Sequence, residues 1–122
     1  MSLSTLPATY FQAVDTRNID LVISLFAPDA TFTVVTANMT FTGTNEIRRM
    51  FTDFIANSKT LSHTITSLVV DEKAGKVATE QDYVGESVDG TRSALHNCNF
   101  FDVVDGRFTR VVVWMSGASP LK

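Results

Sequence analysis

The sequence predicts an α+β fold in which three helices pack on one face of a strongly curved, mostly antiparallel sheet. Apolar residues recur at helical spacing in the first half of the chain, whereas long β-branched runs separated by turn residues occupy the second half. The pair Asp105-Gly106 lies between the last two of these runs and is a strong hairpin signal. Helices followed by a series of strands are typical of α+β domains, whose helices cover one face of the sheet.

Two short helices are expected near the N-terminus. Leu6, Tyr10 and Val14 lie four residues apart and therefore share one face of a first helix. Asn18 is a suitable N-cap for a second helix, whose apolar residues continue at helical spacing until Pro28 stops the pattern. We expect these two helices to pack as a pair.

A short hairpin and a third helix are expected next. β-Branched residues dominate 31–36, and the alternation of apolar and polar residues resumes at 39–42. Gly43 interrupts the second strand, and Thr44 is a suitable cap for a helix that runs through Asn57. The core-facing stripe of this helix consists of Ile47, Met50, Phe51, Phe54 and Ile55.

The second half of the chain is expected to form an antiparallel meander. Turn-forming pairs such as Asp89-Gly90 and Asp105-Gly106 separate its strands. Short turns join neighbouring antiparallel strands, so consecutive strands should lie side by side. The four expected strands cover residues 61–71, 76–88, 91–104 and 108–115.

Length and composition favour one cytoplasmic domain spanning residues 1–122. The net charge of -3 and the scattered lysines and arginines argue against nucleic-acid binding, because phosphate contacts need a basic face. The single cysteine, Cys98, has no disulfide partner in the chain, and no Cys/His spacing resembles a metal site. The first seven residues lack the features of a signal peptide, and no apolar run approaches the roughly 18 residues of a membrane span.

Several short motifs occur in a specific order along the chain. They are Tyr10, the stretch Leu25-Phe26-Ala27-Pro28-Asp29-Ala30-Thr31, Gly43 with Ile47-Arg48, and Asp105-Gly106-Arg107. Together with the order of elements they resemble the nuclear-transport-factor-2-like superfamily, and in particular its SnoaL-like and ketosteroid-isomerase-like branch. The resemblance implies a cone whose concave face holds an apolar pocket and whose convex face forms a homodimer. It does not specify a reaction, because this superfamily includes enzymes, binding proteins and assembly modules.

The resemblance also implies roles for individual residues. Tyr10 and Asn99 match positions at which ketosteroid isomerases keep donors to the oxyanion of an enolate intermediate. Val34 occupies the position of the isomerase's general base, and Val113 occupies the position of the acid that other relatives carry on the last strand. Neither valine can move a proton, so any acid–base chemistry needs another group.

Asp82 and His63 are the candidates for the missing base. The carboxylate of Asp82 would have a raised pKa in a partly apolar cone, and an imidazole such as that of His63 titrates near neutrality without any perturbation. Side chains alternate along a strand, so the two possible registers of this strand point either Asp82 or its neighbours Gln81 and Tyr83 into the cone. The sequence leaves both registers open.

The same alternation divides the next strand between a pocket face and an interface. If Asn99 points into the cone, Asn97 does so too, and His96 points to the convex face. On the convex face, Phe100, Val112 and Trp114 would form an apolar dimer interface together with His96. The residues expected to contact a ligand are Phe32, Val34, Phe51, Phe54, Asn97, Val113 and Met115.

These features favour a homodimeric enzyme that uses no cofactor and no metal. It would isomerise, cyclise or dehydrate a hydrophobic, polyketide-like or steroid-like molecule by proton transfer. Tyr10 and Asn99 would be the oxyanion donors, and Asp82 or His63 would be the base. The alternative, favoured by Val34 and Val113, is a non-catalytic module that binds a small ligand or mediates dimerisation.

Overall fold

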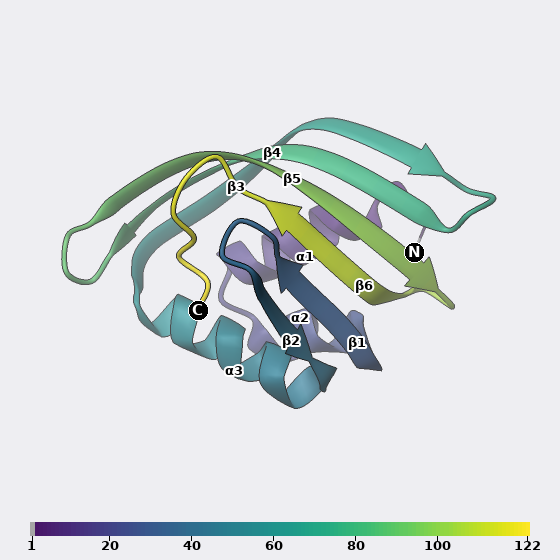
Figure 1. Ribbon diagram of the computed structural model, residues 1–122, viewed down its shortest axis with the longest axis horizontal. Coiled ribbons are helices and arrows are strands. Elements are labelled where there is room, and N and C mark those ends of the chain that lie inside the picture. Colours follow the sequence, from purple (N-terminus) through teal and green to yellow (C-terminus); the bar gives the residue numbers. More distant parts are fainter. Residues whose placement is uncertain (1) are drawn as a thin grey trace.

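The computed structural model describes residues 2–122, and Figure 1 shows the sheet curving over three helices. The predicted α+β class, with its helices on one face of a curved sheet, is confirmed. None of the described helices has the length and apolar character that crossing a membrane requires. The helices are α1 (Leu6–Asp15), α2 (Ile19–Ser24) and α3 (Gly43–Ala56). The strands are β1 (Phe26–Val34), β2 (Met39–Thr42), β3 (Ser58–Asp71), β4 (Lys76–Ser87), β5 (Arg92–Val104) and β6 (Arg107–Trp114).

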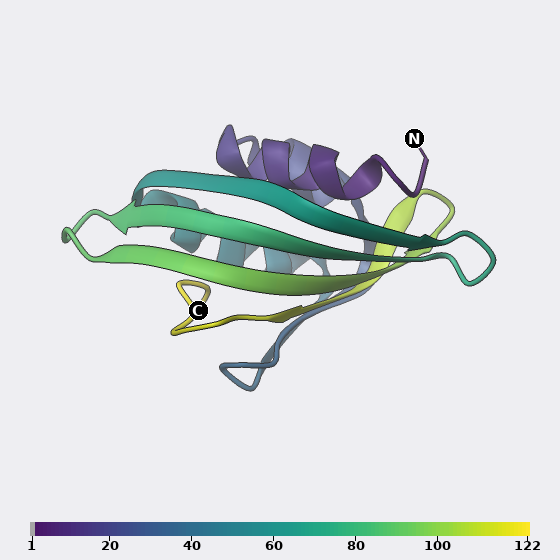
Figure 2. The same cartoon turned by 90° about the horizontal axis from the view of Figure 1, so that it is seen from above.

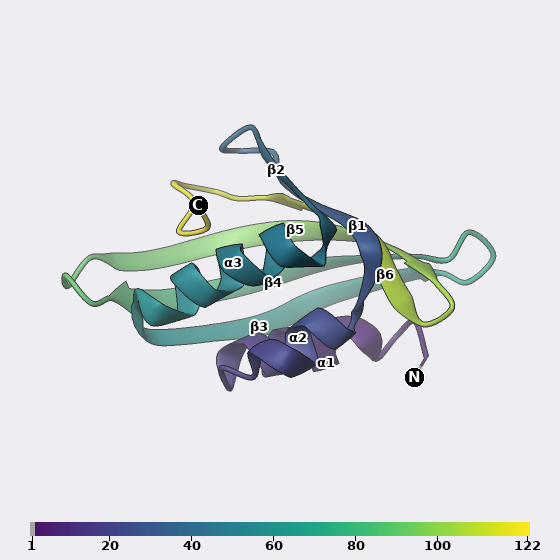
Figure 3. The ribbon, with the colours of Figure 1, turned by 90° about the horizontal axis from the view of Figure 1, so that it is seen from below.

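The six strands form one mixed sheet with the order β2-β1-β6-β5-β4-β3. The strands from β3 to β6 form the predicted antiparallel meander. One pairing is parallel, because β1 runs beside β6 in the same direction. Viewed from above and from below, the helices lie on a single side of the sheet, with α1 alongside β3 and α3 beneath the middle strands (Figures 2 and 3). This arrangement buries the concave face and leaves the convex face uncovered.

The second helix starts as predicted but ends early. The Asn18 side chain accepts a hydrogen bond from the Leu21 backbone N–H at 3.1 Å, which confirms the N-cap. The helix ends at Ser24, although the apolar pattern continued to Phe26. Phe26 instead begins β1 and pairs with Phe108 of β6. Sheet pairing therefore overrides the local helical periodicity at these residues.

The third helix begins differently from the prediction. Thr44 was expected to be its cap, but the structure makes Thr42 the N-cap residue, without a capping bond from the Thr42 side chain. The Glu46 carboxylate instead accepts a hydrogen bond from the Thr42 backbone N–H at 2.9 Å. Gly43 provides the left-handed turn into the helix, with a φ of +83°. The predicted apolar stripe of this helix is buried, as expected.

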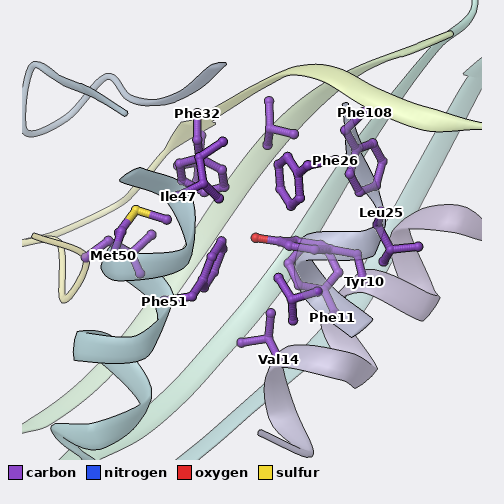
Figure 4. Close-up of a cluster of buried hydrophobic side chains, with 14 of the residues drawn as sticks. Tyr10, Phe11, Val14, Leu25, Phe26, Phe32, Ile47, Met50, Phe51 and Phe108 are labelled. Atoms are coloured by element: carbon purple, nitrogen blue, oxygen red, sulfur yellow. The ribbon is translucent and has the colours of Figure 1, made fainter. Parts of the chain in front are cut away.

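An aromatic cluster fills the space between the helices and the concave face (Figure 4). Tyr10 of α1 lies at its centre, and most of its ring contacts are edge-to-face. Such pairs each contribute about 0.5–1.5 kcal/mol beyond the burial of their area. The rings whose centroids lie 4.9–6.1 Å from that of Tyr10 belong to Phe11, Phe26, Phe51, Phe101 and Phe108.

The register of β4 decides which of its side chains face the helices. Gln81 and Tyr83 are buried, whereas the Asp82 side chain is 54% exposed on the convex face. The expectation that Asp82 opens into the cone is therefore wrong, because strand alternation sends its carboxylate to the opposite face. On β5, Asn97 and Asn99 are buried and His96 is exposed, so the predicted alternation of that strand is correct.

Candidate functional site

A small cavity lies between α1, α3, the middle strands and the C-terminal segment. Its free volume is about 30 Å³, which is room for one or two water molecules. The wall is mostly apolar, with polar atoms supplied by a few side chains from three strands and one helix. The lining residues are Tyr10, Val14, Phe51, Phe54, His63, Tyr83, Asn97, Met115, Pro120 and Leu121.

His63 and Asp15 form a bidentate pair at the edge of this cavity. The Nδ1 atom of His63 lies 2.6 Å from Asp15 Oδ1, and the backbone N–H of His63 donates to Asp15 Oδ2 at 2.7 Å. An ionised carboxylate only accepts hydrogen bonds, so the pair favours the imidazole tautomer with its proton on Nδ1. The Nε2 atom then carries a lone pair and is free to accept a proton.

His63 lines both the inner cavity and a groove on the outer surface. Asp15 and His63 both line this groove, whose volume is about 390 Å³, but Asp15 does not line the inner cavity. Asp15 occupies Nδ1, and among residues 2–122 no hydrogen bond is made by Nε2, which leaves Nε2 as the ring nitrogen open to a ligand. Phe11 stacks on the ring with a centroid distance of 4.8 Å, and Tyr83 packs against it at 5.0 Å. These contacts fix the orientation of the imidazole plane.

Tyr10 brings a buried hydroxyl group to the same cavity. In Figure 4 its oxygen points away from α1, toward the space between Phe26 and Phe51. Within residues 2–122, this hydroxyl makes no hydrogen bond to another side chain or to the backbone. Burial raises the pKa of the Tyr10 phenol far above its usual range, and the nearby negative charge of Asp15 adds to the shift. Tyr10 is therefore a neutral hydrogen-bond donor at all ordinary pH values.

Asn97 adds an unsatisfied acceptor. The residue is 5% exposed, and its Oδ1 atom is buried without a hydrogen-bond partner among the described residues. Leaving such a group unpaired costs about 1–3 kcal/mol, so a native structure is expected to supply a partner. A ligand or water in the cavity would supply one.

Tyr83 completes the polar lining and depends on a glycine. A Cβ atom added at Gly85 would lie 2.1 Å from the Tyr83 hydroxyl oxygen, so only glycine leaves room for this ring. Burial raises the pKa of Tyr83, while a hydrogen bond with Ser58 partly offsets the shift. Tyr83, like Tyr10, is a neutral phenol. Among residues 2–122, no group of three or more His, Cys, Asp or Glu side chains is arranged to hold a metal ion.

The comparison with known proteins follows from this architecture. Residues 8–111 match the family of SnoaL-like domains. The chain belongs to this family. No curated protein sequence matches the chain at a significant level.

Solved structures share the fold of this SnoaL-like protein at low sequence identity. A protein of Catenulispora acidiphila with a ketosteroid-isomerase-like fold, in complex with trimethylamine, is 20% identical with a TM-score of 0.80, covering 88% of this chain and 82% of its own. An LEH-like epoxide hydrolase of M. tuberculosis is 17% identical with a TM-score of 0.81, covering 93% of this chain and 82% of its own. A Shewanella denitrificans protein provisionally called a SnoaL-like polyketide cyclase is 14% identical with a TM-score of 0.84, covering 93% and 90%.

The structure brings together only part of the expected site of this SnoaL-like protein. Tyr10 and His63, proposed from the sequence as donor and base, both line the cavity. Asn99 points to the concave face but lies outside the cavity lining, and its Oδ1 accepts a hydrogen bond from Gln81 Nε2 at 2.7 Å. Gln81 also accepts a bond from the Thr79 hydroxyl at 2.7 Å. Asn99 is thus a satisfied core group, and Asn97 takes its place at the cavity.

The expected ligand contacts divide in the same way. The sequence analysis grouped them because all lie on inward faces of their elements. An inward-facing side chain can, however, be packed in the core without reaching the cavity. Four of them line the cavity: Phe51, Phe54, Asn97 and Met115. Three are buried in the core away from the lining, which corrects the expectation: Phe32, Val34 and Val113.

Sequence reasoning missed Asp15, Pro120 and Leu121. Asp15 is the last residue of α1 and lies 48 positions before His63 in the sequence, so no local spacing connects the two. Pro120 and Leu121 follow the last strand in a segment without regular structure. Leu121 is nevertheless 8% exposed and belongs to the hydrophobic core. The apolar character of Leu121, close to the end of the sequence, was the only sequence feature that could have indicated its burial.

The convex face of this SnoaL-like protein carries a second histidine pair and two exposed aromatic rings. His96 Nδ1 lies 2.6 Å from Asp82 Oδ1, and His96 Nε2 lies 3.1 Å from Glu80 Oε2. Hydrogen bonding with Asp82, and secondly with Glu80, raises the pKa of His96. Phe100 and Trp114 lie edge-to-face with ring centroids 5.7 Å apart, and each is more than 40% exposed.

One part of the expected interface needs correction. Val112 pairs with Phe100 and so faces the convex side as expected, but only 3% of the residue is exposed, so it is covered by its neighbours and adds little to an apolar surface. Its neighbours across the sheet, Phe100 on β5 and Thr33 on β1, flank it on both sides. The uncovered aromatic patch therefore consists of Phe100 and Trp114.

Proposed function

We propose that this protein catalyses proton transfer on a small hydrophobic molecule, as an isomerase, cyclase or dehydratase that works by acid–base chemistry. The observation that carries the proposal is the His63 imidazole at the cavity wall, with its Nδ1 on Asp15 at 2.6 Å. A base oriented by a second group, beside a buried neutral donor, is an arrangement suited to general acid–base catalysis. Polyketide-like and steroid-like molecules belong to the substrate class that we propose.

The reaction divides between three side chains. His63 Nε2 accepts a proton from a carbon next to a carbonyl group, and the resulting charge moves to the carbonyl oxygen. The Tyr10 hydroxyl donates a hydrogen bond to that oxygen, and the buried, mostly apolar surroundings make the interaction strong. Asp15 stabilises the imidazolium that forms and holds its orientation. Return of the proton from His63 Nε2 to another carbon completes an isomerisation, whereas its transfer to a β-hydroxyl group, which leaves as water as the C–O bond breaks, completes a dehydration.

Asn97 orients the ligand in this scheme. Its buried Oδ1 accepts a hydrogen bond from a hydroxyl or amine of the ligand, or from a bound water. The family membership of the chain and the names of its structural relatives, an epoxide hydrolase and a provisional polyketide cyclase, are consistent with chemistry on small molecules.

The second candidate is a non-catalytic module that binds a small ligand. Val34 and Val113, both buried, occupy the two positions where relatives were expected to carry acids. A binding module needs only a complementary cavity and has no use for an activated base. The contribution of His63 to turnover separates the two candidates.

We also propose that residues 1–122 form a single cytoplasmic domain that assembles as a homodimer. The exposed Phe100 and Trp114 rings lie together on the convex face, where a second copy would cover them. Cys98 is a free thiol whose pKa is raised by burial, and a thiol of this kind suits a reducing compartment.

Deuterium incorporation tests the proposed chemistry. The ketone 2-tetralone is incubated with the protein in D₂O, and loss of its α-proton signals is followed by ¹H NMR against a protein-free sample. We expect exchange above background, and a decrease of about 10²- to 10⁴-fold in His63→Asn, which retains an N–H for Asp15 but removes Nε2. His96→Asn, on the convex face, is the matched control and should exchange normally. Equal rates in the wild type and His63→Asn would support the binding module instead.

A further inference from the structure

The cavity is too small for the molecules that its chemistry would handle. Its free volume is about 30 Å³, whereas ligand sites in proteins occupy roughly 300–1,000 Å³. One or two water molecules fit, but a ring with a carbonyl group does not. Some of the residues that line the cavity must therefore move before a ligand can bind.

Most of the wall is fixed by helices and strands, but one side is not. Pro120 and Leu121 lie in the segment 115–122, which follows β6 and contains no helix or strand. Figure 1 shows this segment returning from β6 toward α3, with the C-terminus beside that helix. Leu121 is 8% exposed and packs into the core, so its isobutyl side chain fills space at the cavity.

Among the described residues, hydrogen bonds attach the segment 115–122 to the rest of the fold only at its first residues. The Ser116 hydroxyl oxygen accepts a hydrogen bond from the His96 backbone N–H at 2.9 Å, which anchors the start of the segment to β5. Within residues 2–122, the hydrogen bonds of 117–122 are internal and join only Ser119 with Leu121. Side-chain contacts alone hold the rest in place, and segments of this kind open at low free-energy cost.

A pivot lies directly after the anchor. A Cβ atom added at Gly117 would lie 2.9 Å from Cδ2 of Leu95, so the chain passes close to the sheet at this residue. Glycine permits that approach and also permits a wide range of backbone angles. Rotation about Gly117 would move Pro120 and Leu121 away while the sheet and the helices stay in position.

We propose that the Leu121 side chain occupies the space that the apolar part of a ligand takes, and that it moves out of the cavity when the ligand binds. We call this side chain the plug. The inference rests on the proposed function, because Tyr10 and His63 define the polar end of the same cavity. The ligand is then a small molecule with a carbonyl or hydroxyl group at its inner end and a branched or cyclic hydrocarbon at its outer end. Leu121 competes with the hydrocarbon and so determines which ligand sizes bind well.

The apparent affinity equals the intrinsic affinity multiplied by the fraction of molecules in which the Leu121 side chain has left the cavity. Leu121→Ala removes most of the competing side chain. Since full burial of a leucine side chain contributes an amount equivalent to a factor of about 10–100 in an equilibrium constant, ligands should bind about 10- to 100-fold more tightly to this variant. The gain should be larger for a bicyclic ketone than for a monocyclic one, because the bicyclic ketone needs more of the space that Leu121 occupies.

Titration with cyclohexanone and 2-tetralone, followed by ¹H–¹⁵N NMR, measures these affinities. The variants are Leu121→Ala, the size-conserving Leu121→Met, and Val69→Ala as a control that removes an exposed apolar side chain from β3. We expect tighter binding only in Leu121→Ala. In the wild type, amide hydrogen exchange of 117–122 should become faster when the ketone saturates the protein. If Leu121→Ala does not fold, a chain lacking residues 120–122 replaces it.

The plug is wrong if Leu121→Ala binds both ketones within twofold of the wild type, or if neither protein binds them. It is also wrong if saturation leaves the exchange of 117–122 unchanged. The proposed function fails separately. Normal α-proton exchange in His63→Asn would refute the base but not the plug, whereas exchange that depends on His63 with no effect of Leu121 would refute only the plug.

Discussion

The Asp15 carboxylate contacts both the side chain and the backbone of His63. One carboxylate oxygen lies 2.6 Å from the imidazole Nδ1, and the other accepts the His63 backbone N–H at 2.7 Å. The first contact sets the tautomer of the ring, and the second fixes the start of its side chain relative to α1. A single residue thus controls both the protonation pattern and the position of the proposed base.

Asp15→Asn is expected to reverse the imidazole tautomer. The amide oxygen of the variant still accepts the His63 backbone N–H, but its NH₂ group then faces Nδ1 and requires a lone pair there. The ring proton moves to Nε2, which can no longer act as a base toward the cavity. ¹⁵N NMR of the imidazole should show the change of tautomer, and α-proton exchange of 2-tetralone should fall about 10²- to 10⁴-fold.

Asp82→Asn is the matched control for this change. Its carboxylate lies at the same 2.6 Å from the Nδ1 of a histidine, but on the convex face. This variant should alter the NMR signals of His96 and leave the exchange rate unchanged. Retention of the Nδ1–H tautomer in Asp15→Asn with a normal rate would contradict the orienting role of Asp15.

Tyr10 makes stability depend on pH in the alkaline range. Its pKa is raised by burial in the folded state, whereas in the unfolded chain it is about 10. Above pH 10 the unfolded state loses the phenolic proton while the folded state keeps it, so the free energy of unfolding decreases as the pH rises. One such group contributes a slope of about 1.4 kcal/mol per pH unit.

Tyr10→Phe should remove the Tyr10 contribution to this slope and keep the fold, while Tyr83, whose pKa burial also raises, continues to contribute. The aromatic contacts stay, and the lost hydroxyl has no hydrogen-bond partner in residues 2–122, so stability at neutral pH should change by less than about 1 kcal/mol. Urea unfolding at several pH values between 8 and 11 measures both effects. The α-proton exchange rate should also fall, by about 10²- to 10³-fold for the loss of an oxyanion donor. An unchanged rate would exclude Tyr10 from the chemistry.

The sequence predicts the fold better than the site for a physical reason. Periodicity and turn residues report which face of an element is buried, so the helices, the meander and the inward faces of β5 could all be predicted. These patterns do not report the register between strands. A register shift of one residue would exchange Asp82, which lies on the outer face, with Tyr83, which lies on the inner face. Contacts across the fold, such as Asp15 with His63, depend on tertiary geometry that no local pattern contains.

Gly85 should be intolerant of even the smallest side chain. A methyl group there would lie 2.1 Å from the Tyr83 hydroxyl oxygen and 3.0 Å from the Thr60 carbonyl oxygen. The ring would have to turn toward the cavity, at a cost of about 1–3 kcal/mol for overpacking. Gly85→Ala should therefore lower the midpoint of urea unfolding, and Tyr83→Phe in the same chain should restore part of the loss. Gly90→Ala, whose added methyl group meets no atom within 4 Å but whose φ is +89°, measures backbone strain alone.

The final prediction concerns assembly through Phe100 and Trp114. Both rings are exposed and lie edge-to-face 5.7 Å apart, so covering them would supply the aromatic centre of an interface. Trp114→Arg places a charge at that centre, and loss of an aromatic hot spot of about 2 kcal/mol or more weakens a dimer at least about 30-fold. Sedimentation equilibrium should show a dimer for the wild type and monomers for the variant. Val69→Arg, which adds the same charge at an exposed site on β3, should remain dimeric. A monomeric wild type at micromolar concentration would refute the interface, and with it the proposed homodimer.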